Sequence, residues 1–366
     1  MNERKQCILC KGNLVEFYTI PNFPISMTPT EEDECVVSTQ IYGACDKCNC
    51  VQMMNLIDPL ILYKNNHNET YNTPTWKSHH IQFAEFIHTS GILNTDAFIE
   101  IGGNPAILYP LLGCKNYTIM NICDPETPSS LVKFIVGNCE TYTFDRSSNL
   151  IMSHVFEHLY NPSKFVENIA VCEVDTVFIS IPNMDALLDA GIPNCLNNEH
   201  TYFINDKLIR RLFGNNGYDC VRFEKFREHS YFFMFKKLSP PGGVISFNVD
   251  NDEISQRTKF LDIFKGLEKK LVYPNLPICE NTFISPGGHY GQFTHHYLKP
   301  TSLVGFLDND PSKQGKYVYG TGRRAFPFDI LNKYHGQRVR VFLYACPYTK
   351  ELRKQLEEYA VEVVEL

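Results

Sequence analysis

The stretch from Ala97 to Leu108, AFIEIGGNPAIL, constrains the fold of this chain more than any other. Its first five residues suit a buried strand, two glycines follow, and the apolar residues from Ala106 can begin a helix. A strand that stops in a glycine turn before a helix brings backbone N–H groups close to a ligand, because glycine has no side chain in the way. Taken alone, the pattern also fits an ordinary strand-to-helix turn.

The residues around this turn predict a doubly wound α/β sheet. We predict a helix at Ile81–Ile92, and apolar or β-branched runs predict further strands at Tyr117–Cys123, Thr141–Phe144, Leu150–Val155 and Thr176–Ile181. Strands that alternate with helices indicate a mostly parallel sheet. Two closely spaced runs, Cys220–Phe226 and Tyr231–Lys236, favour a hairpin and therefore an antiparallel edge.

Polar residues follow several of the predicted strands. Asp124 and Asp145 each follow an apolar run, and His154 comes after LIMS. Because the carboxyl ends of parallel strands meet at one edge of a sheet, we expect these side chains to lie near the glycine turn. Asp124 stands about twenty residues beyond that turn, where an acid can accept both hydroxyls of a ribose. Each acid alone is equally compatible with a helix cap or a turn.

The cysteines indicate a metal centre near the N-terminus. Six of the fourteen cysteines lie in the first 50 residues, and four of them form two Cys-x-x-Cys pairs, Cys7 with Cys10 and Cys45 with Cys48. Two such pairs predict one closed, structural four-cysteine zinc site. Two disulfides or four unrelated thiols are the alternatives. Cys50 can replace Cys48 as a ligand, and Cys35 is expected to take no part.

Charge and composition narrow the classes of function. The net charge of −7 argues against nucleic acid or an anionic membrane as a partner, because both require a clustered basic surface. The start of the chain, MNERKQCILC, lacks the apolar core of a secretory signal, and no apolar stretch approaches the length of a membrane span. We therefore expect a cytoplasmic protein. Its 366 residues suggest two or three domains.

The segment His154-Val155-Phe156-Glu157-His158 formally matches H-x-x-E-H, the inverted zinc-protease pattern. That chemistry requires both histidines on one face of a helix. Here a β-like run leads directly into His154, and Asn161-Pro162 closes the segment before a helix has room to form. A zinc protease is therefore only a remote alternative.

These motifs together resemble those of class I methyltransferases that use S-adenosylmethionine. That class carries an acid-x-Gly turn after its first strand, an acid after its second and an H-V-x-E-H segment after its fourth, which correspond here to Glu100-x-Gly102, Asp124 and His154–His158. Within the class, the chain is most similar to three-part sugar methyltransferases that act on nucleotide-linked deoxysugars. The resemblance runs from Cys7 to the end and includes the segment NEHTYF, Asn198–Phe203.

The resemblance implies a domain organisation and a set of site residues. It implies a zinc module with a linker or lid (1–75), a methyltransferase domain (76–245) and a Rossmann-like domain (246–366). Cofactor contacts are expected from Glu100, Gly102, Asn104, Asp124, Asp145 and His154. His200 is the predicted general base, oriented by Glu199, since a histidine titrates near neutral pH; the alternative is a packed or capped histidine. His154 is expected to line the methyl-transfer pocket, and substrate contacts are expected from Tyr71, His158, Tyr202, Lys313 and Arg323.

The last third of the chain carries a second, weaker glycine motif. After a helix predicted at Glu253–Val272, a short strand at Asn281–Ile284 leads into SPGGHYG, and the next strand ends at Asp308, about twenty residues later. Lys313 and Arg323 can meet a diphosphate there, although a solvated basic loop is the alternative. In the resembling family this domain is structural and helps to enclose the nucleotide-sugar.

The chain departs from the family pattern at two places. Pro105 and Ala106 stand where an acid and a glycine often occur in the first loop, and Leu196-Asn197-Asn198 lacks the tyrosine of C-methylating members. The resemblance still implies C- or O-methylation of a nucleotide-linked deoxysugar, and we expect a monomer or homodimer. The alternative from another class is a non-catalytic protein that binds a nucleotide-sugar or the cofactor through a degenerate fold.

Overall fold

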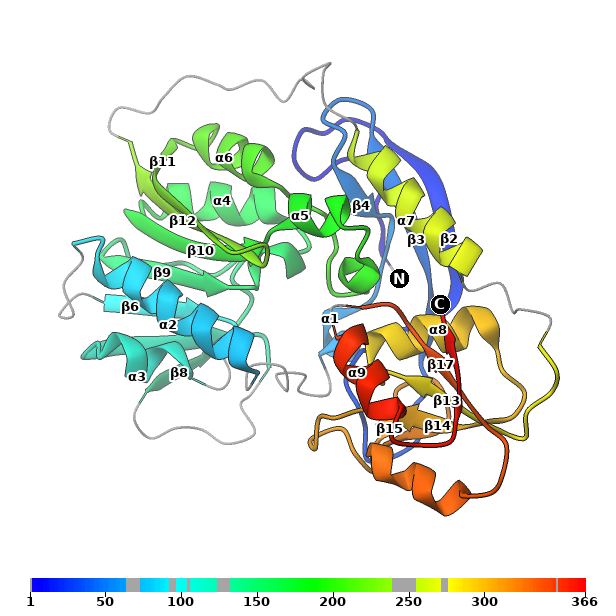
Figure 1. Ribbon diagram of the computed structural model, residues 1–366. Helices are drawn as coiled ribbons and strands as arrows, with labels where there is room; N and C mark the ends of the chain where they lie inside the picture. The colour runs from blue at the N-terminus through cyan, green and yellow to red at the C-terminus, as the bar shows by residue number, and fades with distance from the viewer. Residues whose placement is uncertain are drawn as a thin grey trace.

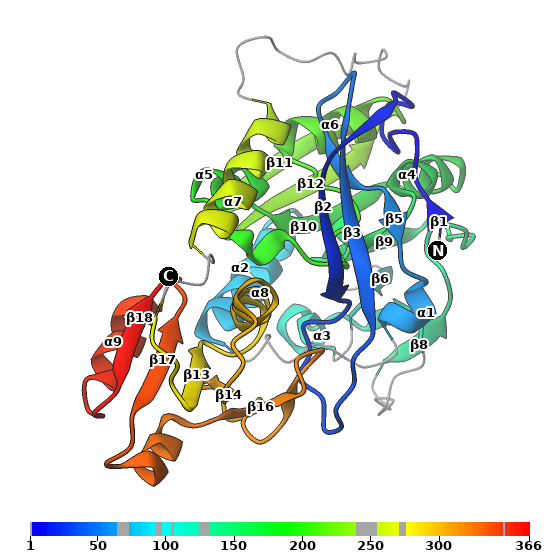
Figure 2. The ribbon, with the colours of Figure 1, turned by 90° about the vertical axis from the view of Figure 1, so that its right-hand side faces the viewer.

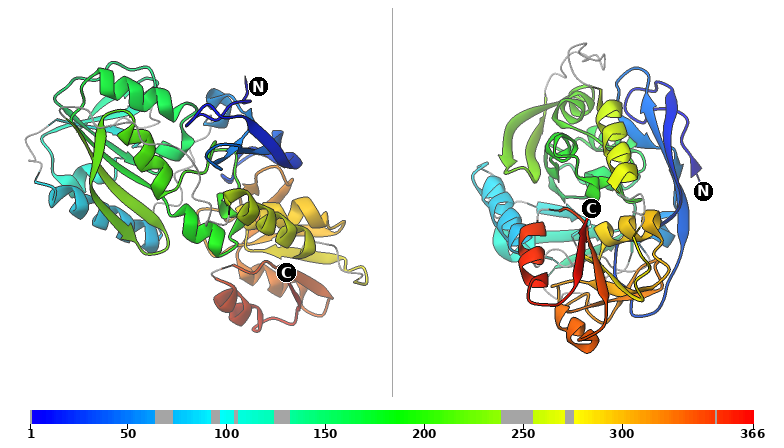
Figure 3. Two further views of the ribbon diagram at one scale, coloured as in Figure 1. Left: turned by 90° about the horizontal axis from the view of Figure 1, so that it is seen from above. Right: turned by 45° about the vertical axis from the view of Figure 1, so that its right-hand side comes forward.

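The computed structural model describes residues 2–63, 73–91, 97–103, 106–123, 132–238, 255–270, 276–346 and 348–366. These residues form a seven-stranded sheet, a six-stranded sheet, a three-stranded sheet and a two-stranded ribbon. The N-terminal strands and the C-terminal sheet lie on the same side of the seven-stranded sheet (Figures 1 and 3). No helix of the described residues combines the length and the apolar character that crossing a membrane requires.

The central sheet is doubly wound with an antiparallel edge, as predicted. Its strands are β6 (Ala97–Ile101), β7 (Asn116–Asn121), β8 (Lys133–Val136), β9 (Ser148–Ser153), β10 (Thr176–Pro182), β11 (Tyr218–Phe226) and β12 (Ser230–Lys237). They are ordered β11-β12-β10-β9-β6-β7-β8. The strands from β8 to β10 are parallel, and β12 runs antiparallel to both β10 and β11.

One predicted strand is wrong. The run Thr141–Phe144 forms no strand, and the edge strand next to β7 is β8, which comes earlier in the chain. The Asn138 carbonyl accepts the backbone N–H groups of Thr141 and Tyr142 and closes a turn there. Phe144 packs edge-on against Phe165 with ring centroids 6.3 Å apart. The apolar character of this run therefore reflects packing against the core, which periodicity cannot distinguish from strand pairing.

Helices cover both faces of the central sheet. On one face lie α2 (Pro74–His88) and α3 (Leu108–Leu112), and on the other α4 (Pro162–Val171) and α6 (Asp206–Gly214). Successive residues of a strand point to opposite faces, so Phe98 packs with the α2 side and Ile99 with the α4 side. Helix α2 begins seven residues before the predicted Ile81, because Thr73 caps it and Pro74 occupies its first turn. Trp76 therefore lies on a helix and not in a linker.

The N-terminal part is an antiparallel sheet of β2 (Leu14–Pro24), β3 (Val37–Cys45) and β4 (Val51–Met53), with a ribbon of β1 (Asn2–Glu3) and β5 (Asn55–Leu56). The short helix α1 (Pro59–Leu62) follows it. Figure 2 shows how far β2 and β3 extend along the molecule. Helix α7 (Gln256–Lys270) packs on this sheet, where Phe264 stacks on Tyr18 with ring centroids 3.7 Å apart.

The C-terminal part is a second, Rossmann-like sheet. It contains β13 (Asn281–Ser285), β14 (Leu303–Leu307), β15 (Tyr317–Val318), β16 (Arg323–Phe326), β17 (Val339–Leu343) and β18 (Glu362–Glu365), in the order β15-β16-β14-β13-β17-β18. Every neighbouring pair except β15 and β16 is parallel. Helices α8 (His289–Leu298) and α9 (Thr349–Leu356) and the 3₁₀ helix η4 (Phe328–Tyr334) connect these strands.

The three parts share one of their hydrophobic cores. Phe23 from β2, Phe203 from the segment before α6 and Phe293 from α8 belong to a single buried cluster. Helix α5 (Met184–Asp189) and the 3₁₀ helix η3 (Pro193–Cys195), which follow β10, contribute to the same cluster. Burial of this kind holds the chain segments after β10 firmly against both neighbouring parts.

Candidate active site and metal centre

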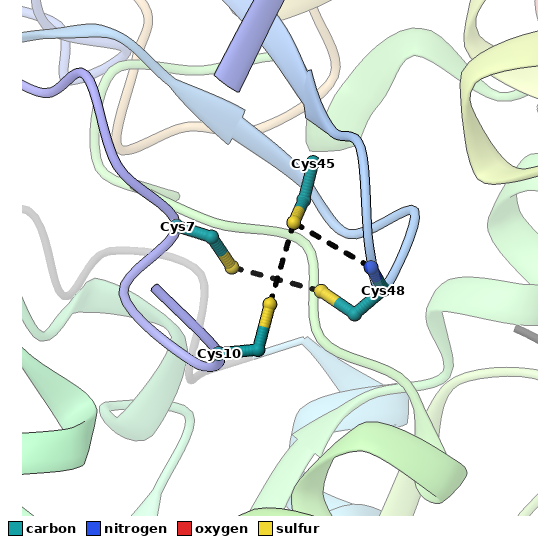
Figure 4. A group of neighbouring side chains, drawn as sticks. All are labelled: Cys7, Cys10, Cys45 and Cys48. Carbon is teal, nitrogen blue, oxygen red and sulfur yellow. Dashed lines mark hydrogen bonds between the residues drawn. The ribbon is translucent and has the colours of Figure 1, made fainter. Parts of the chain in front are cut away.

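The four cysteines of the two Cys-x-x-Cys pairs converge on one point (Figure 4). The Sγ atoms of Cys7 and Cys48 are 3.6 Å apart and those of Cys10 and Cys45 are 3.4 Å apart. Four thiolates around a zinc ion at the usual bond length are about 3.8 Å from one another, whereas a disulfide requires about 2.05 Å. The donor set and its spacing fit a structural zinc ion, with Cys48 and not Cys50 as the fourth ligand. Cys35 is exposed and lies outside the cluster.

The glycine turn after β6 has no room for side chains. Gly102 has a φ of +78°, and a Cβ atom added there would lie 2.4 Å from Val155 Cγ2. A Cβ atom on Gly103 would lie 2.2 Å from the carboxyl carbon of Glu100. Only glycine therefore allows the turn to pack this closely against Val155 and Glu100, while the Gly102 N–H donates to the Met120 carbonyl at 2.8 Å. Asn104, Pro105 and Asp124, which the sequence also placed here, lie outside the described residues.

We expect Gly103→Ala to destabilise the protein by about 1–3 kcal/mol, because Glu100 is buried and cannot move aside for the added methyl group. Gly266→Ala is the matched control, since nothing lies within 4 Å of its Cβ position in α7. That change should stabilise the helix by up to about 1 kcal/mol. Urea unfolding of both variants checks the difference, and equal free energies of unfolding would contradict it.

Glu100 is a buried acid beside the glycine turn. Its side chain is 4% exposed, and its Oε2 accepts a 2.7 Å hydrogen bond from the Tyr117 hydroxyl. Burial raises the pKa of Glu100 from its ordinary value of 4.5 to about 7, and the Tyr117 hydrogen bond opposes that rise. The carboxyl group is thus close to half-protonated at neutral pH. A cationic ligand nearby would favour its charged form.

Glu100→Gln should remove a pH dependence of stability. Between pH 4.5 and about pH 7 the folded chain holds a proton on Glu100 that the unfolded chain releases, so the free energy of unfolding falls as pH rises through this window. The pKa difference corresponds to about 3 kcal/mol in total, none of which remains in the glutamine variant. Urea unfolding at several pH values measures the slope. Glu85→Gln, at an exposed position of α2, should leave the slope unchanged.

His154 follows β9 in a left-handed backbone conformation, with a φ of +53°. Its Nε2 lies 2.8 Å from the Ser230 hydroxyl, and its Nδ1 lies 3.4 Å from Glu157 Oε1. Ser230 is fully buried, and its hydroxyl also lies 2.6 Å from His229 Nδ1. The hydroxyl therefore holds the His154 imidazole in place. Its burial prevents it from serving as a nucleophile. Burial and neighbouring histidines hold the pKa of His154 well below its ordinary value. The imidazole is therefore neutral and firmly oriented.

A cluster of aromatic and histidine side chains, which the sequence did not predict, surrounds His154. Trp76 packs edge-on against His154 and His229, with ring centroids 4.6 and 4.8 Å away. His79 lies beneath them, 2.8 Å from the Ser180 hydroxyl, and His80 stacks on the tryptophan. Burial lowers the pKa of His80 and of His229 to about 4, so both are neutral at pH 7. The adjacent histidines His79 and His80, three and four residues after the tryptophan, were the available sequence signal.

A second group of polar side chains lies on the other side of Glu157. Ligand atoms of Glu157, His158 and His200 all lie within 4.8 Å of one another. The carboxylate of Glu157 is 2% exposed, and neither of its oxygens accepts a hydrogen bond from a described residue. The 3₁₀ helix η2 (Phe156–His158) begins only after His154, so the two histidines of H-x-x-E-H do not share a helical face. This geometry does not support the zinc-protease alternative.

His200 is presented by a rigid loop. Asn197 Oδ1 accepts the backbone N–H groups of Glu199 and His200 at 2.9 and 3.0 Å, and Asn198 Nδ2 donates to the Pro24 carbonyl at 3.0 Å. His200 is half-buried, and its Nδ1 has no hydrogen-bond partner among the described residues. Its ring lies 5.2 Å from that of His158. The structure therefore places an available nitrogen of His200 next to His158.

A histidine of the C-terminal part, His289, lies near Glu199 and His200. Burial lowers the pKa of His289, the first residue of α8, to about 4, whereas its hydrogen bond with Gln292 and the charge of Glu199 oppose that fall. Its Nε2 has no hydrogen-bond partner within the described parts of the chain. One ring nitrogen of His200 and one of His289, from the central and C-terminal parts, thus lack a hydrogen-bond partner among the described residues, as expected at a site that binds a polar ligand.

Four predicted site residues lie elsewhere or are engaged in structural contacts. Asp145 is exposed and lies three residues before the start of β9, at the amino edge of the sheet, where Ser147 donates two hydrogen bonds to it. Tyr202 is fully buried and its hydroxyl donates to the Phe156 carbonyl. Lys313 is 3.3 Å from Asp308, after β14, whereas Arg323 donates to the carbonyl of Leu303, where β14 begins. The structure therefore does not bring Lys313 and Arg323 together, and Tyr71 lies outside the described residues.

Comparison with known proteins gives structural likenesses only. No protein-family model matches the chain, and no curated protein matches it. Magnesium protoporphyrin IX methyltransferase from Synechocystis, with bound SAH, is 13% identical at a TM-score of 0.34, over 45% of this chain and 84% of that one. A 1,6-didemethyltoxoflavin-N1-methyltransferase from Burkholderia thailandensis is 10% identical at a TM-score of 0.39. The match covers 54% of this chain and 95% of that one. Likenesses this low say nothing about the substrate of this chain.

The fold class follows from the strand order. Five parallel strands, continued by an antiparallel hairpin, form a doubly wound, mixed α/β sheet. The chain adds an N-terminal four-cysteine cluster and a C-terminal Rossmann-like sheet to it. The predicted fold class is thereby confirmed.

Proposed function

We propose that the protein is an S-adenosylmethionine-dependent methyltransferase that acts on a nucleotide-linked deoxysugar. The observation that carries this proposal is the tight glycine turn beside the buried Glu100, at the carboxyl edge of the doubly wound sheet. Ligands of doubly wound sheets bind at that edge. S-adenosylmethionine supplies a methyl group that its sulfonium has already activated.

The residues of the turn suit this cofactor. Glu100 and Gly102, with Asn104, would hold its methionine part, and Asp124 would accept its ribose hydroxyls. The positive charge of a sulfonium or an ammonium group would compensate a Glu100 carboxylate that burial otherwise disfavours. His154, fixed between Ser230 and Glu157, would form the wall between this pocket and the acceptor.

The acceptor side would use His200 as the general base. Its Nδ1 has no hydrogen-bond partner in the described chain, and the loop that carries it is held by Asn197, so the imidazole is available to take a proton. A hydroxyl acceptor loses its proton to His200 directly. For a carbon acceptor beside a keto group, His200 removes the C–H proton and a donor such as His158 stabilises the developing oxyanion.

The nucleotide part of the substrate would extend toward the C-terminal sheet. Gly287 and Gly288 precede α8 there, and Lys313 Nζ lies 3.6 Å from the Cβ position of Gly288. A helix N-terminus and an ammonium group close to bare glycines suit a diphosphate. Arg323 lies at the opposite end of β14 and would contact the substrate only through another part of it.

Titration with S-adenosylhomocysteine by calorimetry tests the cofactor part of the proposal. We expect one ligand per chain, and no heat at high ligand concentration would contradict it. Incubation of a panel of nucleotide-sugars with S-adenosylmethionine, followed by mass spectrometry, then tests the substrate class. A gain of one methyl group on a nucleotide-sugar supports the transferase. Cofactor binding without methylation of any nucleotide-sugar would favour a non-catalytic binding protein instead.

A further inference from the structure

The group formed by Glu157, His158 and His200 has the composition of a metal site. It contains one carboxylate and two imidazoles, whose ligand atoms lie within 4.8 Å of one another. Divalent transition metals such as Zn²⁺, Co²⁺ and Ni²⁺ prefer imidazole nitrogen and carboxylate oxygen in this combination. This group is separate from the four cysteines, which form a closed sulfur site of their own.

The buried carboxylate of Glu157 is the second observation that points to a cation. A carboxylate with neither oxygen hydrogen-bonded is rare inside a protein, because removing it from water is costly unless a partner compensates it. Oε1 faces His154 Nδ1 at 3.4 Å, which leaves Oε2 for another partner. His200 Nδ1 likewise has no hydrogen-bond partner in the parts of the chain that the structure describes.

The two segments that carry these ligands are tied together. Thr201 donates its hydroxyl to the Leu159 carbonyl at 2.7 Å and its backbone N–H to the Glu157 carbonyl at 3.3 Å. The buried guanidinium of Arg4 spans both segments, with hydrogen bonds of 2.9 Å to the Tyr160 carbonyl and 2.5 Å to the Thr201 carbonyl. The ligands are thus held in place by their surroundings, as a site that binds a metal ion tightly requires.

We propose that Glu157, His158 and His200 bind a divalent transition-metal ion. Three protein ligands leave at least one coordination position open, which is typical of sites where a metal contacts a substrate oxygen. His154, anchored by Ser230, serves as the outer partner of the ligating carboxylate. A nitrogen of His200 that binds a metal ion cannot also accept a proton. An excess of zinc should therefore inhibit any turnover that uses His200 as the general base.

Binding is measured on the full chain after its four-cysteine site has been loaded with zinc. Titration with Co²⁺ should add one further ion per chain, with visible d–d absorption and without the sulfur-to-cobalt charge-transfer bands of thiolate ligands. Glu157→Gln and His158→Ala should each weaken this binding by more than about 100-fold. His335→Ala, at an exposed position, should leave it unchanged.

Three outcomes would overturn the proposal. They are the absence of a further ion, cobalt bound only through sulfur, and equal affinity in wild type and in both ligand variants. Circular dichroism reports whether the variants fold. If they do not, anomalous scattering from a zinc-soaked crystal of the wild-type chain decides, because the ion must lie among the three side chains. Neither measurement contains a methyl donor, so a negative result leaves the proposed methyl transfer standing.

Discussion

Replacement of His200 by alanine should lower methyl transfer by about 10²–10⁴-fold and leave the affinity for S-adenosylhomocysteine unchanged. The proposed base is lost, whereas the glycine turn and Glu100, which would hold the cofactor, pack against Val155 and Tyr117. Backbone contacts of the loop survive, because Asn197 binds the N–H groups of residues 199 and 200 and not the imidazole. Steady-state kinetics and calorimetry on the same preparation measure the two effects.

Chemical rescue distinguishes the loss of a general base from damage to the structure of the site. Free imidazole added to the His200→Ala variant should restore part of the turnover, and should do nothing for the wild-type chain. His335→Ala is the matched control, since this exposed histidine lies far along the sequence, after η4. Full turnover by His200→Ala would show that the base is another residue, and a loss of cofactor binding would show that the change had damaged the fold.

Motifs confined to a few residues predicted the fold well. The glycine turn, the alternating strands and the hairpin from Tyr218 to Lys237 specify the central sheet, because local sequence determines where each strand stops and turns. The four-cysteine cluster followed from two short spacings. Its ligands come from loops about 35 residues apart, and the thiol chemistry makes their meeting predictable.

The site was harder to predict because its residues meet through the fold. Glu157 belonged to a recognised motif, but its burial without a hydrogen-bond partner depends on the loop that carries His200, some 40 residues later. His289, whose charge environment includes Glu199, comes from helix α8 of the C-terminal part. For Asp145, the sequence suggested a place in the site that the fold does not give it. An acid after an apolar run suggested a strand end, whereas that run packs as a turn and Asp145 therefore lies at the wrong edge of the sheet.

Replacement of Cys45 by serine should remove zinc from the four-cysteine centre and lower stability by at least about 5 kcal/mol, because metal binding in such sites contributes directly to folding. A loss of that size corresponds to a fall in melting temperature of about 10–20 °C for a domain of 150–250 residues. Metal analysis and a thermal melt measure both effects. Cys35→Ser is the matched control, since this exposed cysteine lies outside the cluster and should change neither value.

The same variant should also impair the active site before it unfolds the chain. Strand β4, six residues beyond Cys45, pairs with the segment that follows His200: Phe203 donates to the Val51 carbonyl at 2.9 Å, and Met53 donates to the Thr201 carbonyl at 3.0 Å. The four-cysteine cluster thereby fixes the position of the proposed base from outside the central sheet. Below its own melting temperature, Cys45→Ser should therefore turn over more slowly while it still binds S-adenosylhomocysteine. Unchanged turnover in zinc-free, folded protein would refute this coupling.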